Sequence, residues 1–111
     1  MIVVQNKDKY DLVSYKNDYG IPVIFSAYYS DGFNLNDQIV FVVEDDIITK
    51  EPWTITSDEF EFELRFTEEE AKKLSVSRYS YSFKQYREGQ YLDTIMDGEI
   101  IIRKTVVWQQ D

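Results

Sequence analysis

Alternating apolar and charged residues mark the clearest β-strand of the chain. In the stretch EFEFELRF, residues 59–66, apolar side chains occupy every second position and charged side chains lie between them. Because successive side chains of a strand point to opposite faces of a sheet, this period of two predicts one buried and one exposed face. A large apolar side chain contributes about 1.5–3 kcal/mol when it is buried. Phe60, Phe62, Leu64 and Phe66 are therefore predicted to form a main wall of the core.

A short helix is predicted directly after this strand, over residues 67–74. Thr67 and Glu70 have the spacing of a capping box, in which each side chain accepts a hydrogen bond from the backbone N–H of the other residue. Two further glutamates follow Thr67, where the helix dipole favours negative charge, and Lys72 and Lys73 lie in the last turn, where it favours positive charge. A helix of about two turns is too short to be stable alone, so we expect it to cap one end of a β-sandwich.

The second half of the chain reads as strands joined by tight turns. Residues 78–87 alternate again, with Tyr79, Tyr81 and Phe83 on one face. Glu88-Gly89-Gln90 predicts a hairpin into residues 91–96, and Asp97-Gly98 predicts a second hairpin into residues 99–108. Upstream, apolar runs at residues 2–4, 10–15, 21–29, 38–44 and 53–55 are further strand candidates, and the continuous run 38–44 is predicted to be covered on both faces.

Successive hairpins with one short helical crossover predict an all-β protein built as a two-layer antiparallel β-sandwich. At 111 residues the chain is expected to be a single domain spanning residues 1–111. A chain of this length can bury about two-thirds of its unfolded surface, so we expect it to fold without a metal or a crosslink.

The chain contains neither cysteine nor histidine. This composition excludes disulfides, the commonest zinc, copper and non-haem iron sites, and nucleophile pairs that use cysteine or histidine. An enzyme with this sequence would depend on carboxylates, lysine, tyrosine or a hard cation. We therefore expect no cofactor and no enzymatic activity.

The net charge is −9, from 21 acidic and 12 basic residues. Binding to nucleic acid or to anionic lipids depends on Lys and Arg, so neither partner is expected. The start, MIVVQNKDKY, lacks the pattern of a signal peptide. The longest fully apolar run, Ile39–Val43, is far shorter than a membrane span. We expect a soluble protein with no visible targeting signal.

Oxygen-bearing side chains are the remaining candidates for chemistry. The loop Asp31–Asp37 has four of them, the type of ligand that Ca²⁺ takes, although its spacing is not that of an EF-hand and Asp, Asn and Gly are ordinary turn residues. Asp45/Asp46 or Glu61/Glu63 would serve as a glycosidase acid and base only in a cleft that separates their pKa values. Acidic strand faces more often serve solubility. No catalytic or metal-binding residue is predicted, and a cation at the loop stays open.

Aromatic residues are the candidates for an interaction surface. Neighbouring positions of a strand alternate between faces, so the tyrosines and tryptophans cannot all point inward. Their side chains are common at protein interfaces, and a planar strip of them can bind sugars. The predicted interaction surface comprises Tyr28, Tyr29, Tyr86, Tyr91 and Trp108.

A series of short motifs follows in a fixed order along most of the chain. Upstream, Asp31-Gly32 precedes Asp37 and the run IVFVV at residues 39–43; downstream come FTEEE at 66–70, Leu74, YSY at 79–81, Gly89, DTI at 93–95 and GEII at 98–101. This order, over residues 18–108, resembles the immunoglobulin-like domains of tailed-phage baseplate and tail proteins, notably the N-terminal domain of the baseplate upper protein.

The resemblance implies an immunoglobulin-like antiparallel sandwich and a non-enzymatic structural or interaction protein of a phage or prophage tail or baseplate. Such a protein is made in the cytoplasm of the bacterial host and then resides in the virion tail or baseplate, where it binds copies of itself or other virion proteins. In such a sandwich Tyr79 or Tyr81 is expected to lock the crossover by a hydrogen bond to the backbone. The alternative function is a carbohydrate-binding module that uses the exposed aromatic residues.

Overall fold

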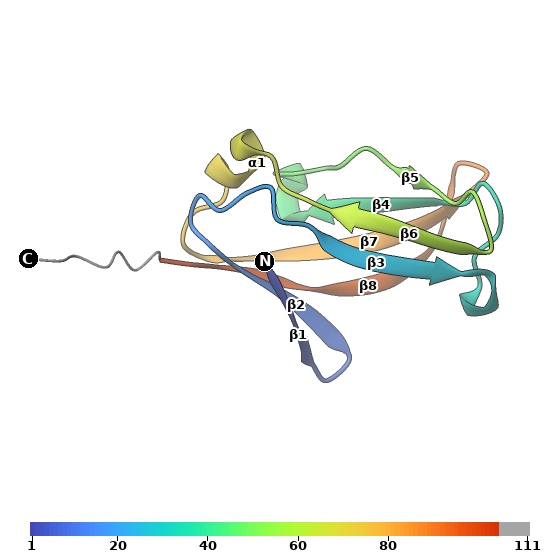
Figure 1. The fold of residues 1–111 in the computed structure, drawn as a ribbon, viewed down its shortest axis with the longest axis horizontal. Helices are drawn as coiled ribbons and strands as arrows, with labels where there is room; N and C mark the ends of the chain where they lie inside the picture. The colour runs from blue at the N-terminus through green and yellow to red at the C-terminus, as the bar shows by residue number, and fades with distance from the viewer. Residues whose placement is uncertain (105–111) are drawn as a thin grey trace, which may run out of the picture.

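The computed structural model describes residues 1–104 and consists of two β-sheets with the apolar core between them (Figure 1). Six strands form the larger sheet, in the order β1-β2-β8-β7-β4-β5, and two form the smaller sheet, β3-β6. The chain is thus an all-β sandwich with one short α-helix. The strands are β1 (Ile2–Asn6), β2 (Lys9–Tyr15), β3 (Val23–Tyr28), β4 (Gln38–Val43), β5 (Trp53–Thr54), β6 (Glu59–Leu64), β7 (Arg78–Arg87) and β8 (Gln90–Arg103).

The predicted alternation in β6 and β7 is confirmed. Phe62 and Leu64 of β6 are buried, and Phe66, just beyond the strand, is buried as well. On β7, Tyr81 and Phe83 are buried on the face that meets the smaller sheet. The two layers meet through aromatic side chains, which supply large apolar area and stack at favourable angles.

The short helix α1 (Glu68–Lys72) joins β6 to β7 and begins at the capping box. The Thr67 hydroxyl accepts a hydrogen bond from the Glu70 N–H, and the Glu70 carboxylate accepts one from the Thr67 N–H at 2.9 Å. The Lys50 ammonium lies 2.6 Å from the same carboxylate and connects the segment between β4 and β5 to the helix. Local capping and one partly buried ion pair therefore fix the crossover in place.

Tyr79 and Tyr81 both hydrogen-bond to backbone atoms, as predicted for at least one of them. The Tyr79 hydroxyl accepts a hydrogen bond of 2.9 Å from the N–H of Ser75, four residues upstream in the crossover, which is the arrangement of a tyrosine corner. The Tyr81 hydroxyl donates to the carbonyl oxygen of Tyr10 in β2. Burial raises the pKa of Tyr81, and the negative charges of Asp11 and Asp97 add to this effect, so the hydroxyl keeps the proton that it donates.

The strand neighbours follow the immunoglobulin pattern in part. β3 pairs with β6 in one layer, as strands B and E do in immunoglobulin domains. In the other layer β4, β7 and β8 are neighbours, as strands C, F and G are in those domains. Most strand pairs are antiparallel, but β2 runs parallel to β8, with Leu12 opposite Ile100 and Tyr15 opposite Arg103. Hairpins can only join antiparallel neighbours, so a pairing between the first and last parts of the chain leaves no turn signal in the sequence.

The hairpin predicted at Asp97-Gly98 is wrong. β8 continues through these residues as one strand of 14 residues, and the φ angle of Gly98 does not lie in the left-handed region that such a turn requires. Residue 98 requires glycine for a different reason, because a Cβ at this position would lie 2.2 Å from the carbonyl oxygen of Tyr10. By contrast, the turn between β7 and β8 has positive φ at Glu88 and Gly89, as a type I′ hairpin does.

The expectation that residues 38–44 are covered on both faces is wrong as well. Ile39, Phe41 and Val43 are buried, whereas Val40 and Val42 on the opposite face are only half-buried. The larger sheet has a layer on one side only, so the outer face of β4 keeps part of its solvent contact.

Replacement of Gly98 by alanine is predicted to destabilise the protein by about 1–3 kcal/mol, because the added methyl group meets a backbone atom that no side-chain rotation can move away. Urea unfolding measures the free energy directly. The half-buried Ser82, which pairs with Asp97 next to Gly98, supplies the control: Ser82→Ala is expected to change stability by less than about 0.5 kcal/mol. Equal stability of Gly98→Ala and the wild type would contradict the close approach of β2 to β8.

Candidate interaction site

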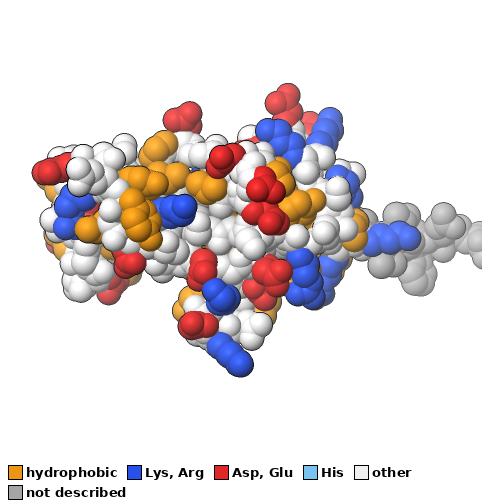
Figure 2. Space-filling view, turned by 180° about the vertical axis from the view of Figure 1, so that it is seen from behind, with side chains coloured by type: hydrophobic (Ala, Val, Ile, Leu, Met, Phe, Trp, Pro, Cys, Tyr) orange, Lys and Arg blue, Asp and Glu red, His pale blue; other side chains and the backbone are white. Residues whose placement is uncertain are grey.

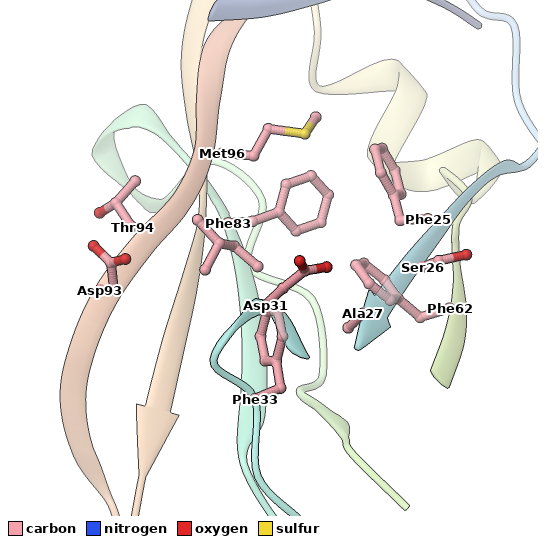
Figure 3. A pocket seen from close by; sticks show the side chains of 11 residues that line it. Phe25, Ser26, Ala27, Asp31, Phe33, Phe62, Phe83, Asp93, Thr94 and Met96 are labelled. Carbon is pink, nitrogen blue, oxygen red and sulfur yellow. The ribbon is translucent and has the colours of Figure 1, made fainter. Parts of the chain in front are cut away.

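A cavity of about 360 Å³, with both aromatic and polar side chains in its lining, opens between the two layers where β3 faces β8 (Figure 3). Phe62 and Phe83 form its floor, and Phe25 and Met96 line its sides. The ring of Phe25 lies 5.4 Å from that of Phe62 and 5.0 Å from that of Phe83. The cavity therefore has the size and the aromatic lining of an ordinary binding pocket.

Acidic side chains lie around the opening of this cavity. The exposed carboxylate of Asp31 is directed toward it, whereas Asp93 and Thr94, on β8, point away from it (Figure 3). Among the described residues 1–104, no Lys or Arg side chain lines the cavity. A ligand that combines an apolar group with a positive charge fits this distribution best.

The loop that carries Asp31 and Phe33 to the cavity is held by a partly buried ion pair between Asp37 and Arg87. Asp37, which is 1% exposed, accepts hydrogen bonds of 2.9 Å from Nε and from a terminal nitrogen of Arg87, and it accepts further bonds from Gln85 and from the Asn34 N–H. Arg87 and Gln85 also donate to the carbonyl oxygen of Gly32, in the same loop. Two side chains of β7 thus fix the loop that forms one wall of the cavity.

These hydrogen bonds also determine the ionisation of Asp37. The Arg87 guanidinium contributes most to lowering the pKa of Asp37 to about 2, and the Asn34 N–H and Gln85 lower it further against the opposing effect of burial. The oxygen atoms of Asp37 are therefore occupied by protein donors. Within residues 1–104, no group of three or more acidic side chains has the arrangement of a metal site.

The backbone edge of β3 beside the cavity has no neighbouring strand within residues 1–104. The N–H of Tyr29 donates a hydrogen bond of 3.1 Å to the backbone carbonyl oxygen of Asp58. Hydrogen bonds to one neighbouring strand recur at every second residue of an antiparallel strand, so the N–H and C=O groups of Val23, Phe25 and Ala27 point toward β6. The N–H and C=O groups of residues 24, 26 and 28 consequently point away from β6. They form an open edge directly above the cavity.

The aromatic residues predicted as an interaction surface do not form one planar strip. Tyr28, Tyr29 and Tyr91 are exposed, and Tyr86 is half-buried. The rings of Tyr86 and Tyr91 meet at 75°, edge to face. Trp108 lies outside the described residues. A flat platform for a sugar ring is therefore not formed by the pair Tyr86 and Tyr91.

The carboxylate pairs considered for catalysis lie away from the cavity. Glu61 and Glu63 are exposed on β6, and Glu63 forms an ion pair of 3.0 Å with Arg65. Asp45 and Asp46 are exposed in the turn after β4. The cavity residues themselves were not predicted as a site, because Phe25 and Met96 have no sequence signal that separates them from ordinary core residues.

No protein-family model and no curated protein sequence matches this chain. In the part of the chain that the structure describes, no helix has both the length and the apolar character needed to cross a membrane.

Asp37 is predicted to make stability depend on acid pH. Its folded pKa of about 2 lies below the unfolded value of about 3.9, so the stabilisation is present above about pH 4 and is lost as the pH falls toward 2. The loss attributable to Asp37 amounts to about 2 kcal/mol, measured by urea unfolding between pH 2 and pH 7.

Asp37→Asn is expected to lower stability at pH 7 by about 2 kcal/mol, because Arg87 loses its charged partner while remaining partly exposed. The variant should also lose the corresponding acid dependence. Asp18→Asn, at an exposed position, is the control and should keep the wild-type pH profile. If Asp37→Asn and the wild type lose stability in parallel below pH 4, the assignment of the pH dependence to Asp37 is wrong.

Proposed function

We propose that this protein is a non-enzymatic binding domain that takes up an extended segment of another protein along β3, as a component of a phage or prophage tail or baseplate assembly. The observation that carries this proposal is the open edge of β3 above a cavity lined in part by aromatic side chains. Addition of a strand to an exposed sheet edge is a recurrent mode of peptide recognition, in which the backbone supplies hydrogen bonds and pockets select side chains.

The unequal size of the two layers supports this mode of binding. Within residues 1–104 the smaller sheet has two strands and the larger sheet has six, so the smaller sheet cannot cover the whole core face of the larger one. Phe25, Ile95 and Met96 remain only partly buried, although they pack against the core. A third strand next to β3 would extend the smaller layer over these residues and bury more apolar area.

The side-chain pattern of the bound segment follows from the geometry of β3. Every second side chain of an added strand would point into the cavity, against Phe83 and Met96, so those positions should be apolar. The position beside Asp31 should favour Lys or Arg, and the net charge of −9 also attracts a basic partner. The expected partner segment is extended, with apolar residues in alternation and at least one basic residue.

The proposed place in a tail or baseplate rests on the order of motifs along residues 18–108. In such an assembly the expected partner is another virion protein. The carbohydrate-binding alternative has less support, because Tyr86 and Tyr91 are not coplanar.

The test uses a photo-crosslinking amino acid at Ile24, an exposed residue of the open edge, in cells that assemble the tail particles. We expect a covalent adduct with one tail or baseplate protein. Ser26→Pro should reduce the adduct about tenfold, because proline removes the outward N–H and with it one hydrogen bond to the added strand. The β3–β6 pairing should survive, since this N–H does not point toward β6.

Ser26→Ala is the matched control, because it removes the hydroxyl and keeps the N–H. Equal crosslinking of the proline and alanine variants would show that β3 does not pair with the partner. Absence of the chain from purified particles, together with binding to a glycan array, would replace the proposal with the carbohydrate-binding alternative.

A further inference from the structure

A second candidate surface is the strand β1, which forms the edge of the larger sheet. Its apolar side chains are unusually exposed: Ile2 by 64%, Val3 by 38% and Val4 by 46%. The β1–β2 hairpin stands out from the body of the sandwich in both views (Figures 1 and 2). Three consecutive apolar residues on a projecting edge strand form a surface that other chains can reach.

Contacts with β7 and β8 hold this hairpin in position. Tyr81 donates a hydrogen bond to the carbonyl of Tyr10, Asp11 accepts one of 3.1 Å from the Glu99 N–H, and Lys9 forms an ion pair of 2.8 Å with Asp97. β2 also pairs with β8 through residues 12–15. The edge of β1 is therefore presented in a fixed direction, and a partner does not have to order it on binding.

β1 lacks the features that protect edge strands from pairing. Its sequence, IVVQN, contains no charged residue, no proline and no bulge. The opposite edge of the larger sheet, β5, has only two residues and follows Pro52. In the smaller sheet, β6 exposes Glu59, Glu61 and Glu63, and β3 lies within the body of the sandwich rather than on a projecting arm.

We propose that β1 pairs with β1 of a second copy of this chain, antiparallel and centred on Val4. The two-residue turn Lys7-Asp8 is closed by the hydrogen-bonded pair Asn6 and Lys9. Because such pairs alternate along antiparallel strands, the N–H and C=O groups of residues 2, 4 and 6 point toward β2. The N–H and C=O groups of Val3 and Gln5 consequently point outward. A two-fold axis at Val4 places each Val3 opposite Gln5 of the other copy, so that these groups satisfy one another reciprocally.

The charge of the chain favours a second copy at this strand over the other faces. Two molecules that each carry −9 repel each other over most of their surfaces, and β1 is an uncharged strand that projects beyond the body. In the two-fold register Ile2 lies opposite Asn6, and Val4 lies opposite Val4, so no charges meet within the paired strands. The contact joins the two larger sheets edge to edge and is small, so association should depend on protein concentration.

The test exploits the absence of cysteine from the chain. In the proposed register the two Val4 Cα atoms are about 4.5 Å apart, within the range that a disulfide bridges, whereas the two Ile2 residues are roughly 13 Å apart. With copper phenanthroline as oxidant, Val4→Cys should form disulfide-linked dimers about tenfold faster than Ile2→Cys, because pairing holds the thiols at high effective concentration. Ile2 is the more exposed position, so collision alone predicts the opposite order.

Sedimentation of the chain without cysteine gives an independent readout. The wild type should shift from monomer to dimer as its concentration rises. Gln5→Pro removes an outward N–H and should remain monomeric. Gln5→Ala keeps this N–H and should behave as the wild type. Circular dichroism checks that each variant is folded. Equal crosslinking rates for Val4→Cys and Ile2→Cys would overturn the proposal. A dimer that is lost in Ser26→Pro and kept in Gln5→Pro would also overturn it and would assign self-association to β3.

Discussion

The contacts of the Phe83 ring join the two layers of this protein. Phe83 lies on β7 of the larger sheet, is 1% exposed, and has its ring centroid 5.0 Å from that of Phe41 and 5.8 Å from that of Phe62 on the opposite layer. Rings of Phe25 and Trp53 contact it as well. The same side chain closes the core and forms the floor of the cavity, so the fold and the candidate site share one determinant.

Hydrogen bonds and an ion pair complement this aromatic core by fixing the segments that leave it. Asp37 and Arg87 secure the loop at the cavity, and Tyr79 and Tyr81 secure the crossover and the β1–β2 hairpin. Within residues 1–104, every buried side-chain nitrogen or oxygen atom has a hydrogen-bond partner.

Patterns among neighbouring residues in the sequence predicted the strands and the helix well. Contacts between distant parts of the chain could not be predicted from them. Alternation identified β6 and β7, and the spacing of Thr67 and Glu70 identified the helix start, because both depend on neighbouring residues alone. Asp97-Gly98 was misinterpreted because glycine serves turns and close backbone contacts equally, and the contact with Tyr10 spans most of the chain. The cavity could not be predicted for the same reason, since it depends on which core residues the two layers leave partly covered.

The parallel pairing of β2 with β8 has a mechanical consequence. These strands belong to the first and last parts of the described chain and run side by side, with Leu12–Tyr15 opposite Ile100–Arg103. Tension applied between the two parts would load their hydrogen bonds in shear, so that several must break together instead of opening one after another. Forced unfolding is governed by the rate of crossing that barrier. The arrangement therefore resists separation of these two strands by tension along their length.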